Sequence, residues 1–239
     1  MSGLFLALEG IDGAGKTTAA QAAAALLCRQ GRPAVALGRG AGGRVSPYVA
    51  GHMAGLRELI WGEPPGAPYL ELGDEHWVLL QAAWYSAAAR CVVAPAVAAG
   101  YVVLADTWGY KFLAKLRLRP AGAVSFERAQ GVFSAITQPD VVVHLRADPV
   151  VAAARKPVFS GSETGNREGD PDLSVCAFTV YQQRLAGVLE SFACRSGWVS
   201  LDASSLGREE TGAAVAGIAE RYLARLVTAV PVAGGGGGA

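Results

Sequence analysis

The chain has 239 residues, of which 51% are hydrophobic and 17% are charged, and its formal net charge is +1. This length and composition suit one large α/β domain or two small ones with a well-filled core. The net charge is close to zero and the positive residues are scattered along the chain. Both observations argue against a nucleic acid as partner. The most apolar stretch, residues 91–105, contains Pro95 and Gly100 and is too short to span a bilayer as a helix, so we expect no membrane segment. The opening strand leaves no room for a signal peptide, and the four cysteines lack metal-ligand spacing, so we expect reduced thiols in a cytoplasmic protein.

The first motif follows an apolar run at residues 4–9 and precedes an alanine-rich helical segment at residues 17–30. It reads Gly10-Ile11-Asp12-Gly13-Ala14-Gly15-Lys16-Thr17-Thr18. A strand, a G-x-x-x-x-G-K-[ST] loop and a helix in this order are typical of a P-loop, whose backbone amides surround a phosphate chain. Lys16 would reach the β- and γ-phosphates, and Thr17 would offer its hydroxyl to Mg²⁺. We therefore expect ATP to be bound by Gly10, Asp12, Gly13, Ala14, Gly15, Lys16, Thr17 and Thr18. The alternative is a glycine-rich turn that matches the motif by chance.

A second glycine loop follows the short strand predicted at residues 33–37. Residues 38–44 contain four glycines together with Arg39 and Arg44. Such a loop can approach an anion closely and bind it through guanidinium groups, although an ordinary connection would have the same composition.

Residues 47–61 predict a helix that carries Arg57, and the Pro- and Gly-rich residues 62–73 predict a loop. Asp74 would cap a long helix running to about Ala99. Its aromatic interior, residues 77–85, fits either core packing or the wall of a substrate cleft.

The strand predicted at residues 101–105 ends in Asp106, as in a Walker-B strand. The carboxylate would lie at the carboxyl end of a central strand, where it could bind Mg²⁺ through water or accept a proton from an attacking oxygen. The alternative is an aspartate that caps the next turn.

The second half continues the alternation of helices and strands. Lysines and arginines at positions 111, 115, 117 and 119 suggest a solvated helix face, and His144 suggests a core or strand-end histidine. Residues 157–171 form a polar insertion that fits either a mobile lid or a plain surface loop. The remaining predicted elements are helices at 125–136, 149–156, 172–195 and 208–227 and strands at 140–146 and 198–201.

Five strands alternating with helices predict a three-layer α/β fold of the P-loop NTPase type with a mostly parallel sheet. We expect a single domain over residues 1–228, with a short lid at about 156–171 and a flexible glycine-rich tail at 229–239. Both glycine loops and Asp106 follow strands, so they would meet at one edge of the sheet.

The motifs together resemble those of thymidylate kinases. Residues 9–18 are very similar to the opening of that family, and Arg39-Gly40-Ala41-Gly42-Gly43 lies where the family has Arg-Glu-Pro-Gly-Gly. Residues 98–106 are similar to the strand before the family's Asp-Arg-aromatic motif. Further similarities lie at residues 56–59, 138–149 and 201–204, so the resemblance covers about residues 4–226.

The resemblance implies a kinase that moves the γ-phosphoryl of ATP·Mg²⁺ to a nucleoside monophosphate, commonly as a homodimer. Lys16 would be catalytic and Thr17 would bind Mg²⁺, while Asp12 would lie near the acceptor sugar and Arg39 near the acceptor phosphate. Asp106 would be the catalytic-site carboxylate and a second metal contact. Arg155 or Arg167 would supply the charge of the lid.

The departures from the family concern the acceptor side. Thr107 replaces the arginine of the Asp-Arg-aromatic motif, a loss worth roughly 2.7–4 kcal/mol of transition-state stabilisation by analogy with an oxyanion donor. Another arginine could compensate, for example Arg44, Arg57 or Arg90. The thymine-reading arginine falls at Tyr85 or Ser86, and the stacking phenylalanine falls near Ala82. The pocket would instead be lined by Trp84, Tyr85 and Trp108, with Arg57 and Ser86 also near the acceptor.

These observations predict an ATP-dependent phosphotransferase with altered acceptor specificity. An ordinary dTMP kinase is the first alternative. An ATP-binding regulatory protein with little transfer activity is the alternative from another class.

Overall fold

The computed structural model describes residues 3–39, 45–62, 68–119, 126–165 and 172–228. Its centre is a five-stranded, all-parallel sheet with the strand order β2-β3-β1-β4-β5. The strands are β1 Leu4–Glu9, β2 Ala34–Leu37, β3 Val102–Ala105, β4 Val141–Arg146 and β5 Val199–Asp202. The prediction of a five-stranded parallel sheet flanked by helices is therefore confirmed, with strand ends within one or two residues of those expected.

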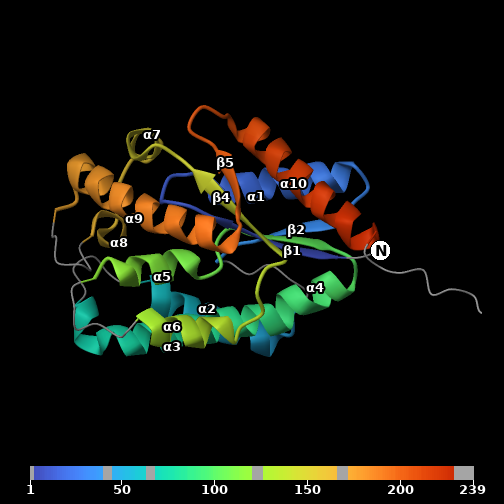
Figure 1. Ribbon diagram of the computed structural model, residues 1–239. Helices are drawn as coiled ribbons and strands as arrows, with labels where there is room; N and C mark the ends of the chain where they lie inside the picture. The colour runs from blue at the N-terminus through green and yellow to red at the C-terminus, as the bar shows by residue number, and fades with distance from the viewer. Residues whose placement is uncertain (1–2, 40–44, 63–67, 120–125, 166–171, 229–239) are drawn as a thin grey trace, which may run out of the picture.

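Helices cover both faces of the sheet (Figure 1). They are α1 Lys16–Arg29, α2 Pro47–Trp61, α3 Gly73–Ala88, α4 Ala94–Ala98, α5 Tyr110–Arg117, α6 Phe126–Ser134, α7 Pro149–Ala154, α8 Gly161–Thr164, α9 Val175–Ser196 and α10 Arg208–Thr228. A 3₁₀ turn, η1 (Tyr69–Leu72), precedes α3, and a π turn, η2 (Ala89–Val93), separates α3 from α4.

The strand β1 shows why both faces must be covered. Leu4, Leu6 and Leu8 pack into the layer of α1, α9 and α10, while Phe5 and Ala7 pack into the layer of α2, α3 and α6. All six residues of β1 are buried. A strand that is apolar on both faces belongs at the centre of a parallel sheet, where this structure has it.

The helix predicted from Asp74 to about Ala99 is helical throughout Gly73–Ala98, but its α-helical register is interrupted by the π turn at Ala89–Val93. The Ala94 N–H donates to the Ala89 oxygen, five residues back, and Pro95 follows in the next turn. A proline has no N–H to donate and its ring collides with the carbonyl four residues earlier, so an α-helical register cannot pass through Pro95 unchanged.

The helical stretch Tyr69–Ala98 is the part of the described chain that is long and apolar enough to cross a membrane by length and composition alone. Its most apolar window is 56% buried inside the fold. This burial is compatible with a core helix of a soluble protein.

The last helix, α10, packs against the first helix, α1. Gly212 of α10 lies so close to α1 that a Cβ at this position would come within 2.5 Å of the Ala22 Cβ. Small residues on both helices permit this approach, and α10 lies along α1 over most of its length (Figure 1).

The predicted lid is described in part. Residues 161–164 form the short helix α8, whose N-terminus is closed by a capping box between Ser160 and Glu163. Residues 166–171, including Arg167, lie outside the described residues, as do Arg44, positions 40–43 and the tail 229–239.

Candidate functional site

The loop between β1 and α1, Gly10–Lys16, has the backbone geometry that its glycines predict. Gly13 and Gly15 have φ angles of +79° and +89°, in the left-handed region that only glycine enters without strain. A Cβ on Gly13 would lie 2.6 Å from the Ala152 oxygen of α7, whereas Gly15 has open space beside it. The loop is therefore packed on one side and open at the start of α1, where helix amides attract an anion.

Lys16 is buried and folds back over this glycine loop. Its Nζ donates to the oxygens of Gly10 and Ile11 at 2.9 and 2.7 Å. Burial lowers the pKa of Lys16 to about 7, and the nearby charge of Lys111 acts in the same direction, against the carboxylates of Asp12, Glu9 and Asp106. A phosphate anion at the loop would favour the charged ammonium.

Thr17 and Asp106 are brought together from distant parts of the chain. The Thr17 Oγ1 donates to Asp106 Oδ2 at 2.8 Å, at the start of α1 and the carboxyl end of β3. The backbone of Gly38 lies beside the same carboxylate, since a Cβ there would be 3.5 Å from Oδ2. A hydroxyl and a carboxylate in contact, beside the glycine loop, fit Mg²⁺ held by few protein ligands and by phosphate oxygens. Among the described residues, no group of three or more His, Cys, Asp or Glu side chains forms an all-protein metal site.

Glu9 is a site residue that the sequence reasoning missed. It ends β1, is fully buried, and accepts hydrogen bonds from the Trp108 N–H at 2.7 Å and from the Thr107 hydroxyl at 3.2 and 3.3 Å. Burial raises the pKa of Glu9, although the Trp108 bond and the charges of Lys16 and Lys111 oppose this. The sequence did contain a signal for this residue, because Glu9 is a charged residue at the end of an otherwise apolar strand.

Lys111 and Lys115 contradict the prediction of a solvated helix face. Lys111 Nζ lies 2.6 Å from Asp12 Oδ1 and Lys115 Nζ lies 3.4 Å from Asp12 Oδ2, and the lysine side chains are only 12% and 14% exposed. The helix α5 begins four residues after Asp106, so its first turns run beside the glycine loop. The i,i+4 spacing then directs both ammonium groups to one carboxylate.

The remaining cations of this segment also have partners. Arg117 lies over the Phe126 ring at 4.2 Å, and Arg119 pairs with Asp74 in a nearly buried contact.

Asp12 is the centre of a wider network. Burial by itself would raise the pKa of Asp12, but Lys111, Lys115 and Lys16 together hold it well below its usual value. The Asp12 N–H donates to Gln182 Oε1 of α9 at 2.9 Å. Gln182 Nε2 in turn donates to the Glu163 oxygen at 2.7 Å, which links the loop to α8.

The described part of the predicted lid joins the same network. Lys115 also donates to the Ser162 oxygen, and Lys156 lies 3.0 Å from Glu163 Oε1. These bonds hold the segment around α8 close to Asp12.

Several predicted site residues have other contacts or are exposed to solvent. Arg155 donates to the oxygens of Ala203 and Ser204 at 3.0 and 3.1 Å and so holds the segment after β5, while its lid role stays a prediction. Arg39 lies over the Trp61 ring at 5.0 Å. Arg57 and Ser86 are exposed on α2 and α3.

The aromatic segment is mainly core. Trp108 is 3% exposed, lies 4.7 Å from the Phe5 ring and 5.2 Å from the Tyr85 ring, and donates through Nε1 to the Thr137 oxygen. Trp84 is equally buried. Burial, together with the Glu9 carboxylate, raises the pKa of Tyr85.

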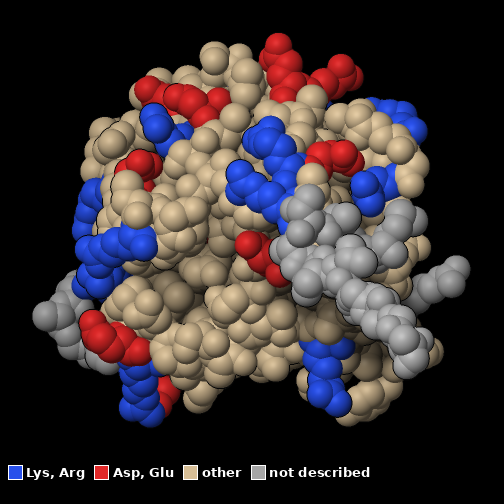
Figure 2. Space-filling model, turned by 45° about the vertical axis from the view of Figure 1, so that its right-hand side comes forward, with Lys and Arg blue, Asp and Glu red and all other residues tan. Residues whose placement is uncertain are grey.

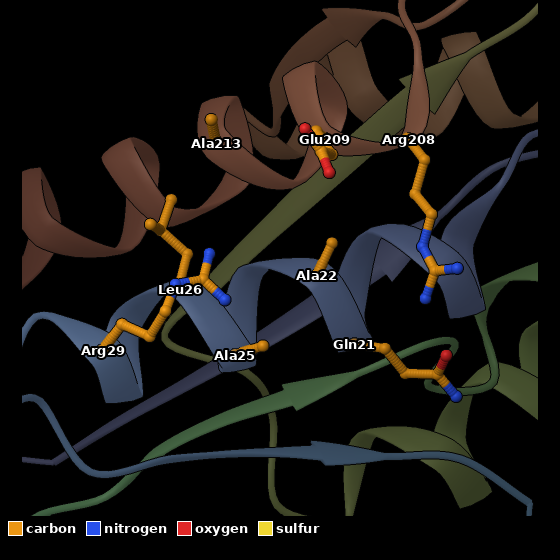
Figure 3. Close-up of a pocket in the computed structure, with 8 residues that line it drawn as sticks. All are labelled: Gln21, Ala22, Ala25, Leu26, Arg29, Arg208, Glu209 and Ala213. Carbon is orange, nitrogen blue, oxygen red and sulfur yellow. The ribbon is translucent and has the colours of Figure 1, made fainter.

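The surface around these elements mixes charges of both signs. Figure 2 shows acidic and basic side chains interspersed on one face of the molecule, in keeping with the small net charge. A separate hollow lies between α1 and α10 (Figure 3). It is lined by Gln21, Ala22, Ala25, Leu26, Arg29, Arg208, Glu209 and Ala213, and by no residue of the glycine loop.

No protein-family model matches the chain. The resemblance to thymidylate kinases therefore depends on short motifs, chiefly residues 9–18, 39–43 and 98–106. The geometry of the site is the remaining evidence for a function.

Proposed function

We propose that the protein is a cytoplasmic phosphotransferase that moves the γ-phosphoryl of ATP·Mg²⁺ to a nucleoside monophosphate or a related nucleotide-like acceptor. The contact between the Thr17 hydroxyl and the Asp106 carboxylate carries the proposal. A hydroxyl at the start of α1 and a carboxylate at the end of β3 are the two protein groups that hold Mg²⁺ in P-loop enzymes. The four free cysteine thiols fit a reducing compartment.

The residues of the loop have distinct roles in this proposal. Bound Mg²⁺ neutralises the charge of the β- and γ-phosphates. Lys16 exchanges its bonds to Gly10 and Ile11 for phosphate oxygens, and the open side of Gly15 leaves room for the phosphate chain. Catalysis is then mostly positioning and charge neutralisation.

The acceptor side supports a substrate other than dTMP. Tyr85 and Ser86, where the resemblance places the thymine-reading arginine, carry no positive charge, and the Thr107 hydroxyl is directed to Glu9. A site without hydrogen bonds to thymine does not discriminate for it. The homodimer implied by the resemblance stays a prediction.

The test is coupled ADP release from ATP·Mg²⁺ over a panel of nucleosides and nucleoside monophosphates. We expect release that depends on an acceptor. Selective turnover of dTMP alone would overturn the altered acceptor, and release without acceptor dependence would indicate an ATPase. Tight ATP binding with no turnover would indicate a regulatory protein.

Two variants give a matched control for the metal contact. Thr17→Ser keeps the hydroxyl and should retain activity, whereas the isosteric Thr17→Val should lose it and require far more Mg²⁺ for half-maximal rate. Lys16→Ala should abolish turnover. Equal activity of the serine and valine variants would mean that the site has been misplaced.

A further inference from the structure

Phosphoryl transfer requires positive charge at the group in transit as well as at the donor. In the proposed site the loop motif accounts for one such cation, Lys16. The residue after Asp106 is Thr107, which is uncharged and donates its hydroxyl to Glu9. A second cation must come from another element.

Lys111 is placed to be that cation. Its Nζ lies 2.6 Å from Asp12, a residue of the glycine loop itself, and its charge acts on both Lys16 and Glu9. It belongs to the first turn of α5, which begins four residues after Asp106. The ammonium therefore lies beside the loop.

Three ammonium groups surround the glycine loop. Lys16, Lys111 and Lys115 converge on the loop, and Asp12 is the carboxylate whose pKa is held low by all three. The carboxylates of Glu9 and Asp106 also act on Lys16, whose own pKa burial lowers to about 7. A phosphate at the loop adds negative charge to this cluster and favours the charged form of its lysines.

Of the arginines that could have replaced the missing cation, Arg57 and Arg90 are exposed on α2 and on the π turn, and Arg44 lies outside the described residues. Arg155 is bound to the segment after β5. The lysines of α5, in contrast, pair with Asp12, a carboxylate of the glycine loop itself.

We infer that Lys111 binds the phosphoryl group in transit, and that its pairing with Asp12 is the resting arrangement of the ligand-free protein. When ATP binds, the Lys111 ammonium moves from Asp12 to the γ-phosphate oxygens, and Lys115 remains with Asp12. The bond from γ-phosphorus to the β–γ bridging oxygen breaks as the bond from the acceptor oxygen forms, and Lys111 keeps its proton. The inference rests on the proposed function and adds a residue that the loop motif does not contain.

Equilibrium binding of ATP·Mg²⁺ and ADP·Mg²⁺ separates this role from a structural one. Lys111→Met should weaken ATP at least about tenfold and leave ADP nearly unchanged, because only ATP carries the γ-phosphate. Equal weakening of both nucleotides would overturn the inference, since it would mean that Lys111 only positions the loop through Asp12. Unchanged binding of both would overturn it as well.

Kinetics provide the second measurement. Lys111→Met should lower kcat by about 10²–10³, the usual loss for one charge-stabilising donor. Adding Thr107→Arg to Lys111→Met should recover at least part of kcat, because it restores a cation from the neighbouring backbone. A structural role would not be rescued in this way, so failure of a folded double variant to regain activity would count against the inference.

Arg195→Met is the control for loss of one positive charge. Arg195 is exposed near the end of α9, roughly 20 Å along the helix axis from Gln182, which touches Asp12. Its activity and its ATP and ADP affinities should match the wild type. A wild type that phosphorylates no acceptor would refute the proposed function alone, because the ATP and ADP comparison needs no acceptor.

Discussion

The ion pairs of Asp12 give the sharpest stability prediction. Asp12→Asn keeps the size of the side chain and an oxygen for Gln182, but it removes the charge between Lys111 and Lys115. The two ammonium groups then lose the carboxylate that both of them contact. We expect a marked loss of stability in the ligand-free protein.

The magnitude follows from the two distances. At an effective dielectric constant of about 20, contacts of 2.6 and 3.4 Å correspond to gross attractions of about 6 and about 5 kcal/mol. Desolvation offsets most of this, and removing one partner of a buried pair costs about 3–5 kcal/mol. For a chain of this size that lowers the melting temperature by about 6–20 °C.

Thermal and urea unfolding measure the effect, with Asp202→Asn as control. The Arg146–Asp202 pair is 3.8 Å long with side chains 51% and 58% exposed, so its loss should cost less than about 1 kcal/mol. Inorganic phosphate should restore more stability to Asp12→Asn than to the wild type, because it supplies the missing anion. A melting temperature of Asp12→Asn within about 2 °C of the wild type would refute the reasoning.

Three further predictions concern the loop and the sheet. At pH 8 ATP binding should take up protons, because the pKa of Lys16 is about 7 in the free protein and bound phosphate raises it. Calorimetry in two buffers of different ionisation enthalpy measures this uptake. Equal binding heats in the two buffers would contradict the prediction. Gly13→Ala should destabilise far more than Gly15→Ala, because both have positive φ but only the Gly13 Cβ would meet the Ala152 oxygen, and similar melting temperatures would exclude this. Burial lowers the pKa of His144, so the unfolded chain gains a proton below about pH 6.5 before the folded chain does, and stability falls as pH falls. His144→Gln should flatten that slope in unfolding measured between neutral and acidic pH, and an unchanged slope would contradict it.

The sheet could be predicted from the sequence because each central strand is apolar on both faces and ends at a glycine or a charged residue. The strand β1 is the clearest case, since Leu4–Glu9 runs directly into Gly10. The change from α-helix to π turn after Ala88 was not predicted, although the sequence contains Pro95. The reason is that the π turn, Ala89–Val93, begins several residues before the proline.

Only those site residues that belong to a local sequence motif could be predicted. Thr17 was identified from the glycine-loop motif and Asp106 from the end of its strand, and the topology brings them together. Lys111 and Lys115 were assigned to solvent because an i,i+4 pair of lysines has the same spacing on an exposed face and on a face that meets Asp12. Only the direction of α5 relative to the loop decides between these, and that direction depends on contacts made by distant residues.

The contact between α1 and α10 has a consequence for biosynthesis. The ribosome delivers Ala22 early and Gly212 almost two hundred residues later, yet the two helices fit together at van der Waals distance. Until α10 has emerged, the face of α1 that packs against it has no cover. The nascent chain must therefore keep this face from other apolar surfaces for most of its synthesis, which makes it a natural site for a chaperone to bind.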